Sequence, residues 1–182
     1  KNLPPEQVMD LIGYVSQDNF LFNVSVRENI RMGNPNASDG EVEAAAKAAN
    51  CHDFIMQLEQ GYDTMAGDAG DRLSGGERQR ITIARAMLKQ ASVIILDEAT
   101  AYADPENEAL IQQAISKLVA GKSLIVVAHR LNTIRNADQI LVVANGEIVG
   151  RGIQEELLEN CPLYRKMWQD YAGSTEGGVE DV

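Results

Sequence analysis

The sequence predicts an α/β protein with a mostly parallel sheet and an inserted α-helical subdomain over about residues 25–90. The apolar runs Val93–Leu96 and Leu124–Ala128 lie on either side of a helical pattern, which is the strand, helix, strand order of a parallel sheet. A length of 182 residues, with 45% hydrophobic and 24% charged residues, suits a globular domain with a core. We expect this domain to cover residues 1–172, followed by a disordered acidic tail over residues 173–182.

In the first half of the chain the pattern is mostly helical. Ser38 and Glu41 have capping-box spacing and begin an amphipathic pattern that includes Val42 and Ala46. Three further elements are expected here: a strand at Tyr14–Ser16, a second capping-box start at Ser25 and Glu28, and a helix at Asp53–Gln60 that Gly61 ends.

In the second half, strands alternate with helices. Val93–Leu96 is a continuous apolar run, typical of a strand buried on both faces, and Leu124–Ala128 is predicted to be the next central strand. Between them Asp104 and Pro105 start a helix as N-cap and first helical residue. The remaining expected elements are the buried helix stripe Ile111, Ala114, Ile115 and Leu118, a hairpin turning at Asn145-Gly146, and a closing helix over Pro162–Tyr171.

Charge and composition exclude several classes of protein. The net charge of −11 counts against a nucleic-acid partner, because phosphates are neutralised by clustered Lys and Arg. The longest apolar runs hold five residues, whereas a membrane-spanning helix needs about 18 or more. Residues 1–10 have no signal-peptide core, and Cys51 and Cys161 are expected to be reduced thiols in a cytosolic setting.

Two segments carry residues suited to phosphate chemistry. In Leu73–Arg80, two glycines follow Ser74, so the helix start is bare of side chains and its amides can approach a phosphate. Asp97 and Glu98 follow a strand, where α/β folds bind ligands. One carboxylate can hold Mg²⁺ and the other can act on the attacking water. The plainer alternatives are a simple capping box at Ser74 and Glu77 and an ordinary acidic pair at the strand end.

Together these segments resemble the nucleotide-binding domain of ATP-binding cassette (ABC) transporters, a P-loop NTPase-like ATPase. The similarity covers nearly the whole chain up to the tail. The matching positions are Gln17 for the Q-loop, Leu73–Gln79 for the signature motif, Asp97 and Glu98 for Walker B, Asp104 for the D-loop and His129 for the H-loop.

The resemblance implies ATP and Mg²⁺ as cofactors and assigns a role to each position. Glu98 would be the catalytic base, His129 would contact the γ-phosphate, and Gln17 would touch the metal or the lytic water. Asp97 would hold Mg²⁺ through its water shell. Ser74, Gly75 and Gly76 would reach across a dimer to the ATP of the partner, and Glu77 and Asp104 are further implied nucleotide contacts.

Within the family, residues 20–30 resemble the exporter type. Phe20, Leu21 and Phe22 would line a groove for the membrane domain, although these residues could also be core. Thr64–Gly70 resembles an exporter loop, with Asp68 in the place of a glutamate, whereas Ala101–Ala103 departs from the usual D-loop. The implied partners are transmembrane domains and a second nucleotide-binding domain, in a homodimer or heterodimer, at the cytoplasmic face of the cell membrane.

A Walker A loop is not found among the 182 residues. Ser116–Ser123 ends in Gly-Lys-Ser, but it has serine where the first glycine belongs and runs from a helix into a strand. We therefore expect a fragment that lacks the Walker A region and is inactive in isolation, with an exposed sheet edge or face. A catalytically dead regulatory piece is one alternative, and a soluble DNA-maintenance ATPase is another, although no long heptad insertion is present.

Two further patterns are interpreted as structural. Arg78, Arg80 and Arg85 are expected to form a solvated helix face, and His52 to be a surface or helix-start residue.

Overall fold

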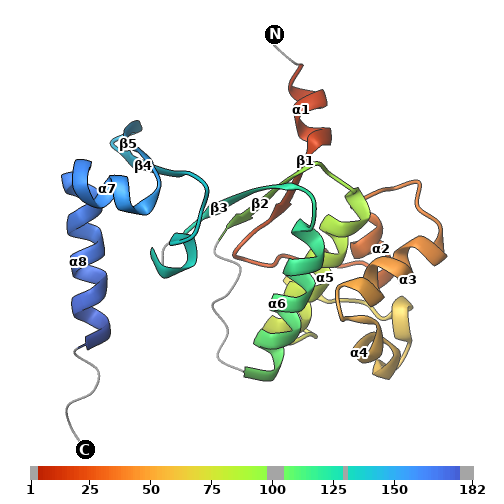
Figure 1. Cartoon of the computed structure of the whole chain (residues 1–182). Coiled ribbons are helices and arrows are strands. Elements are labelled where there is room, and N and C mark those ends of the chain that lie inside the picture. Colours follow the sequence, from red (N-terminus) through yellow and green to blue (C-terminus); the bar gives the residue numbers. More distant parts are fainter. Residues whose placement is uncertain (1–3, 98–104, 129–130, 177–182) are drawn as a thin grey trace, which may run out of the picture. The chain divides into compact units, whose positions relative to one another are not determined.

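The computed structural model describes residues 4–97, 105–128 and 131–176. The chain forms two compact units, residues 1–127 and residues 128–182, and each unit is described separately (Figure 1). The single domain expected over residues 1–172 therefore stays a prediction.

The first unit contains a parallel sheet of three strands in the order β1, β2, β3. These strands are β1 (Ile12–Val15), β2 (Val93–Asp97) and β3 (Ser123–Val127). Helices α5 (Gly75–Lys89) and α6 (Pro105–Val119) lie on one face of this sheet (Figure 1). The α/β class and the parallel pairing of the two apolar runs are confirmed.

The two faces of the sheet differ in burial. Val15, Ile94 and Leu96 are buried, whereas Tyr14 and Ile125 on the other face are 55% and 51% exposed. The prediction that β2 is buried on both faces is wrong, because its alternate residues are only half-buried. Within the described sheet β3 is an edge strand with mostly exposed residues, not a central one. The two apolar runs correctly predicted strands, but they did not predict how far each strand is covered by other elements.

The remaining helices of the first unit are shorter. They are α1 (Pro5–Leu11), α2 (Val26–Arg31), α3 (Asp39–Ala48) and α4 (His52–Gln57), with the 3₁₀ turns η1 (Gly61–Asp63) and η2 (Asp68–Gly70). Helices α2 and α3 pack against α5, whereas α1 lies next to β1 (Figure 1).

The capping-box spacings locate helix starts correctly. Ser38 accepts a hydrogen bond from the Glu41 backbone, and Glu41 accepts one in return from the Ser38 backbone. At Ser25 only the first of these two bonds forms. Gly61 does not end the helix before it, because α4 stops at Gln57 and Gly61 begins η1. This boundary prediction is wrong, since Leu58 already has extended backbone angles.

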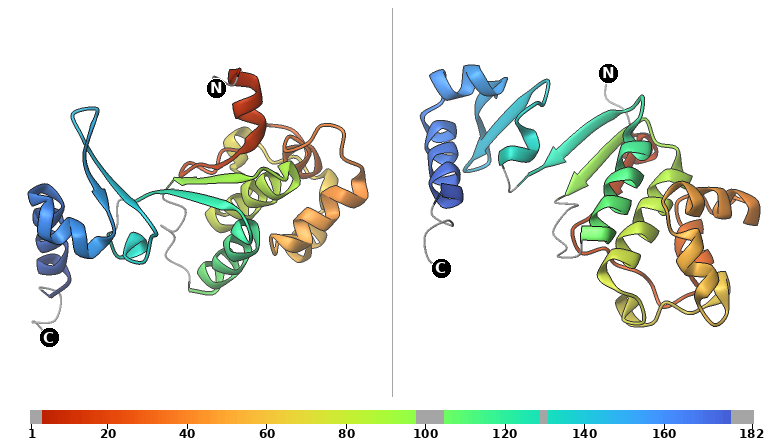
Figure 2. Two further views of the ribbon diagram at one scale, coloured as in Figure 1. Left: turned by 45° about the horizontal axis from the view of Figure 1, so that its top comes forward. Right: turned by 60° about the horizontal axis from the view of Figure 1, so that its bottom comes forward.

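The second unit contains a hairpin and two helices (Figure 2). At its turn, Asn145 and Gly146 both have positive φ, as the predicted two-residue turn requires. Helix α8 extends four residues into the tail expected at residues 173–182, and residues 177–182 lie outside the described part. Its elements are η3 (Leu131–Ile134), β4 (Ile140–Ala144), β5 (Glu147–Gly152), α7 (Gln154–Asn160) and α8 (Pro162–Glu176).

None of the helices in the described ranges combines the length and the apolar character needed to cross a membrane.

Candidate functional site

The carboxyl edge of the sheet brings two predicted site residues to neighbouring strands. β1 pairs with β2 so that Val15 lies opposite Leu96, and Asp97 is the last residue of β2. Gln17 is exposed in the turn that follows β1. Since parallel strands end at the same edge of a sheet, Gln17 and Asp97 share the edge at which such folds bind ligands.

The Asp97 carboxylate has a hydrogen-bond donor that the sequence did not indicate. The hydroxyl of Tyr14 on β1 donates to Asp97 Oδ2 at 2.9 Å. This hydrogen bond raises the pKa of Tyr14 above its ordinary value, with smaller contributions in the same direction from desolvation and from the negative charge of Asp97. One oxygen of Asp97 is thereby oriented at the open face of the sheet. A carboxylate at such an edge suits Mg²⁺, which proteins bind through one or two carboxylates together with water and phosphate oxygens.

Helix α5 begins with the glycine-rich segment that the sequence singled out. Ser74 is its N-cap: Ser74 Oγ accepts from the Glu77 backbone at 3.3 Å, and Glu77 Oε2 accepts from the Ser74 backbone at 2.8 Å. The capping box expected at Ser74 and Glu77 therefore forms, and it is compatible with a phosphate contact at the same helix start. It leaves the amides of Gly75 and Gly76 without an intrahelical partner, because the first turn of a helix has no preceding carbonyls to pair with.

The two glycines differ in burial. Gly75 is half-exposed, whereas Gly76 is buried, and a Cβ atom at Gly76 would lie 3.0–3.2 Å from the side chain of Asn107 on α6. Arg80 donates to the same Asn107 side chain. The close approach of α6 is a second reason for glycine at position 76.

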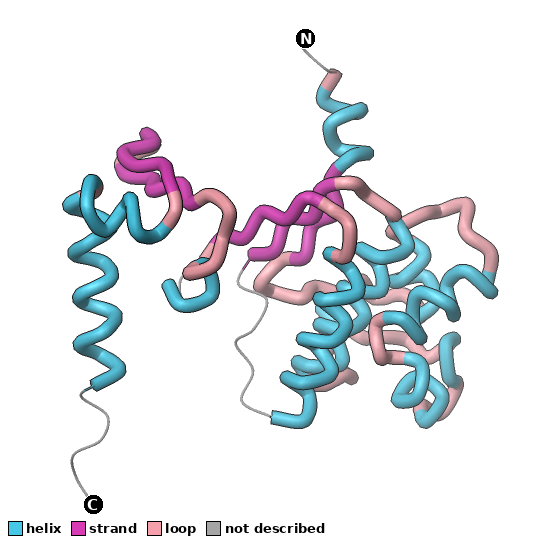
Figure 3. The backbone as a smooth tube through the Cα atoms, in the orientation of Figure 1, coloured by secondary structure: helices cyan, strands magenta, loops and turns pink. Residues whose placement is uncertain are grey.

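The segment after β1 runs as a loop, drawn in pink in Figure 3, from Ser16 to the start of α2. Phe20 and Phe22 are 47% and 49% exposed, and their rings meet edge to face with centroids 5.1 Å apart. Leu21 between them is fully buried. Leu21 therefore belongs to the core and not to the expected groove, because successive side chains in an extended segment point to opposite sides.

The loop at residues 64–70 lies against this segment. An isolated bridge joins Ser25 to Met65, and the Ala66 amide donates to the Val24 carbonyl at 3.0 Å. Asn23 donates to Asp68 at 2.9 Å, so the aspartate in the place of the family's glutamate is held by a neighbour. The two segments that resemble exporters in sequence are thus adjacent in space.

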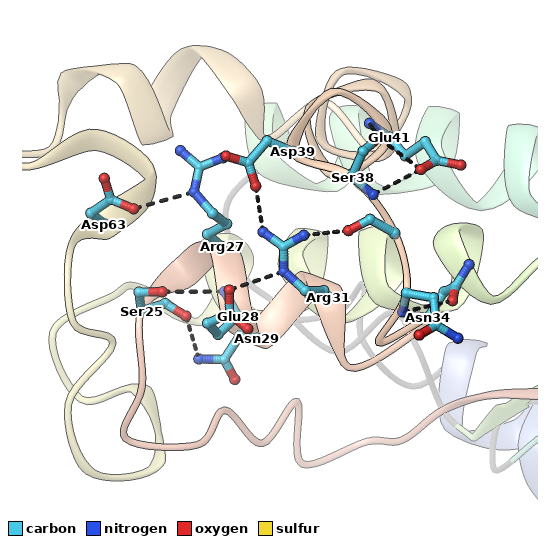
Figure 4. Close-up of polar contacts among 12 residues, drawn as sticks. Ser25, Arg27, Glu28, Asn29, Arg31, Asn34, Ser38, Asp39, Glu41 and Asp63 are labelled. Carbon is cyan, nitrogen blue, oxygen red and sulfur yellow. Dashed lines mark hydrogen bonds and ion pairs between the residues drawn. The ribbon is translucent and has the colours of Figure 1, made fainter.

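An ionic cluster joins α2, α3 and η1 (Figure 4). Arg31 on α2 pairs with Asp39 on α3 at 2.5 Å, and this hydrogen bond lowers the pKa of Asp39. Arg27 pairs with Asp63 at 3.2 Å and lies 5.0 Å from the centre of the Tyr62 ring. The cluster fixes α2, α3 and η1 relative to one another.

Three predicted site residues, Glu98, Asp104 and His129, lie outside the described residues. Their places in the chain are nonetheless defined: Glu98 directly follows β2, Asp104 directly precedes α6, and His129 comes two residues after β3. Among the described residues, no group of three or more His, Cys, Asp or Glu side chains gathers as a metal site.

The expectation that the arginines of α5 form a solvated helix face is wrong. Arg80 is buried, while Arg78 and Arg85 are half-buried, so these residues do not form a solvated face. Arg78 donates to the carbonyl of Leu73 at 2.9 Å, and Arg85 donates to the carbonyl of Asn29 at 2.8 Å. Residue type and spacing gave no signal for this, since Arg80 and Arg85 donate to residues that lie 27 and 56 positions away in the chain. His52, as expected, starts a helix, and it bonds to the Tyr62 hydroxyl.

Comparison with known proteins identifies the family and the fold. Residues 4–101 match the sequence profile of the ABC transporter family. The chain is 52% identical over 158 residues to an ATP-dependent lipid A-core flippase of Syntrophus aciditrophicus (strain SB), covering 87% of the chain and 26% of the flippase. It is 51% identical over 165 residues to the ATP-binding cassette sub-family B member 6 of Homo sapiens, covering 91% of the chain and 20% of that protein.

A solved structure agrees with these relatives. A bacterial Atm1-family ABC exporter with ATP bound matches 97% of the chain and 30% of its own length, with a TM-score of 0.78 and 38% identity. The chain spans about a quarter of the length of such relatives. With the family profile matching more than half of its residues, the chain belongs to the ABC transporter family and has the P-loop NTPase-type fold of an exporter's ATPase domain.

Proposed function

We propose that this chain belongs to the ATP-hydrolysing domain of an exporter and powers transport across a membrane. The observation that carries the proposal is the carboxyl edge of the parallel sheet, where Gln17 lies in the turn after β1, Asp97 ends the neighbouring strand β2 and Glu98 follows directly in the chain. Proteins to which the chain is similar include a flippase and an exporter with ATP bound.

In the proposed mechanism, ATP lies between two such domains. Ser74 and the amides of Gly75 and Gly76 contact phosphate oxygens of the ATP held by the partner domain, and Glu77 keeps Ser74 in place through the capping box. Asp104 would be a further contact to the nucleotide. Glu98 accepts the proton of the attacking water, Gln17 orients that water, and His129 donates to the γ-phosphate.

Asp97 is suited to hold Mg²⁺ beside the phosphates. Its carboxylate lies at the sheet edge, and the Tyr14 hydroxyl orients one of its oxygens. When bound, the metal would neutralise charge on the phosphate oxygens.

The aromatic patch, which we define as Phe20 and Phe22, is the proposed contact with the membrane domain. Both rings are about half exposed to solvent, and exposed apolar groups that gather on a protein surface commonly mark an interface. The neighbouring loop at residues 64–70 completes this surface. This assignment places the chain at the cytoplasmic face of a membrane.

We further propose that the 182 residues alone do not turn over ATP. Tight phosphate binding in this class needs a Gly-rich loop between a strand and a helix, with a lysine on the β- and γ-phosphates. The segment ending in Gly121-Lys122-Ser123 runs from α6 into β3, which is the reverse order.

ATP turnover by the full-length protein with its membrane domains tests the proposal. Glu98→Gln is expected to lower turnover by about 10²-fold or more, as loss of a general base does. Glu108→Gln on the exposed side of α6 is the matched control and should stay within twofold of the parent. Normal turnover in Glu98→Gln would contradict the catalytic role. Turnover by the 182-residue chain at the full-length rate, abolished by Glu98→Gln, would contradict the proposed inactivity.

A further inference from the structure

Helix α5 contacts the aromatic patch through one arginine. Arg85 lies in the C-terminal half of α5 and uses three nitrogen atoms on the loop before α2 and on α2 itself. Its Nε donates to the Asn29 carbonyl at 2.8 Å, one terminal nitrogen donates to Asn29 Oδ1 at 3.0 Å, and the other donates to the Phe20 carbonyl at 3.3 Å.

Asn29 extends these contacts to the other aromatic residue. Its side chain is fully buried, and Oδ1 also accepts from the Phe22 amide at 2.9 Å. Its Nδ2 donates to the carbonyls of Phe22, Val24 and Ser25 at 3.0, 3.3 and 3.1 Å. The backbone on both sides of the buried Leu21 is therefore held by Arg85, at Phe20 directly and at Phe22 through Asn29.

A second tie lies one helical turn earlier on α5. Thr82 Oγ1 donates to Asn19 Oδ1 at 3.1 Å, and Asn19 Nδ2 donates to the Gln17 carbonyl at 3.0 Å. Asn19 and Thr82 are both buried, and Asn19 has a φ of 47°. The loop from Gln17 to Phe22 is thus bound to one side of α5 at positions 82 and 85.

The chemistry of this contact is unusual for an arginine. In the described part of the chain no carboxylate forms an ion pair with Arg85, and burial lowers its pKa below the ordinary value. A half-buried cation that bonds only neutral oxygens is costly to desolvate. Its planar fork nevertheless reaches separate acceptors at the same time, which the single nitrogen of a lysine does not.

We propose that Arg85 is a positioning residue that holds the aromatic patch against α5. A movement of the membrane domain against the patch then displaces the start of α5 at Ser74, Gly75 and Gly76. This inference rests on the proposed function, because it takes the patch to be the contact with the membrane domain. It assigns a function to Arg85, which sequence patterns place only on a solvated helix face, and it makes α5 the element shared by the patch and the phosphate-binding end.

The first test measures amide hydrogen exchange in the 182-residue chain by NMR. Arg85→Lys keeps the charge but loses the fork, and we expect the Phe22 amide to exchange at least tenfold faster. Arg31→Lys is the control, because Arg31 lies on the neighbouring helix and pairs instead with Glu28 and Asp39. Equal Phe22 exchange in a folded Arg85→Lys chain would overturn the proposal. If Arg85→Lys does not fold, Thr82→Val, which loosens the same loop at Asn19, takes its place with the Asn19 amide as probe.

The second test separates positioning from mere stability. In the full-length protein with its membrane domains, we expect Arg85→Lys to keep ATP turnover within twofold while the ATP-driven distance change between spin labels in the membrane domains falls at least fivefold. A structural defect would lower both measurements, and an unchanged distance response would overturn the inference. Phe20→Ala with Phe22→Ala tests the docking surface separately: if this double variant stays fully coupled, the proposed function is wrong at the patch, whatever Arg85→Lys shows.

Discussion

The close crossing of α2 and α5 predicts that Gly33→Ala destabilises the protein. Gly33 is the second residue after α2. A Cβ atom added at Gly33 would lie 2.1 Å from the carbonyl oxygen of Arg85 and 3.0 Å from its carbonyl carbon. Ordinary contacts of a Cβ atom begin near 3.4 Å, so Gly33→Ala requires the two backbones to part by about 1.3 Å. A helix carbonyl has no rotamer by which to move aside, and the whole crossing must therefore shift.

The expected cost follows from this overlap. Overpacking of a buried contact costs about 1–3 kcal/mol, and the loss of glycine freedom in the unfolded chain returns about 0.4–1 kcal/mol. The same shift weakens the Arg85 bonds to Asn29, each worth about 1 kcal/mol. We expect a net loss of about 2 kcal/mol, or about 4–8 °C in Tm for a chain of this size.

Urea unfolding followed by far-ultraviolet circular dichroism measures this loss. The fluorescence of Trp168, the single tryptophan, reports on residues 128–182 instead and should change less. Gly40→Ala is the matched control, because Gly40 lies in α3 with nothing within 4 Å of an added Cβ, and alanine there should stabilise by about 0.5–1 kcal/mol. A Gly33→Ala chain as stable as the parent would refute the described closeness of α2 and α5.

Three further predictions concern single side chains. Burial raises the pKa of the Cys51 thiol from 9.0 to about 12, so iodoacetamide should modify it only through unfolding, and stability should decline as the pH rises from 9 toward 12, where only the unfolded thiol ionises. The lowered pKa of Asp39 contributes stability that is present above pH 3.8 and lost as the pH falls through the folded value, so Arg31→Met should move the acid-unfolding midpoint to higher pH. Ser74→Ala should cost about 1 kcal/mol by removing the N-cap of α5, measured by urea unfolding, and Ser74→Gly only a few tenths.

Local chemistry made the helix starts and the hairpin predictable. Ser38 and Ser74 are each followed by glutamate three residues later, and both boxes form, because both partners lie within one turn. Asn145-Gly146 likewise carries its own turn geometry. Helix α1 escaped prediction because it has no buried residue and hence no apolar stripe to detect.

Long-range contacts were beyond reach of sequence patterns. Tyr14 and Asp97 are 83 positions apart, and Asn29 and Arg85 are 56 apart. In both pairs the residue types suit many environments, so only the strand register and the helix crossing bring them together. The site prediction therefore depended on motifs, and the residues that orient those motifs were missed.

Gly33 and Gly76 each lie at a close contact of α5, but a larger side chain would meet a different obstacle at each position. At Gly33 the obstacle is a backbone carbonyl, so packing alone demands glycine there. At Gly76 the obstacle is the side chain of Asn107, which lies 3.0–3.2 Å from the added Cβ atom and to which Arg80 also donates. Alanine at position 76 therefore requires Asn107 to move by a few tenths of an ångström, a smaller displacement than the one at Gly33. Packing thus favours glycine at both positions, more strongly at Gly33, and the bare amide of Gly76 in the first turn of a capped helix also suits the phosphate contact that we propose.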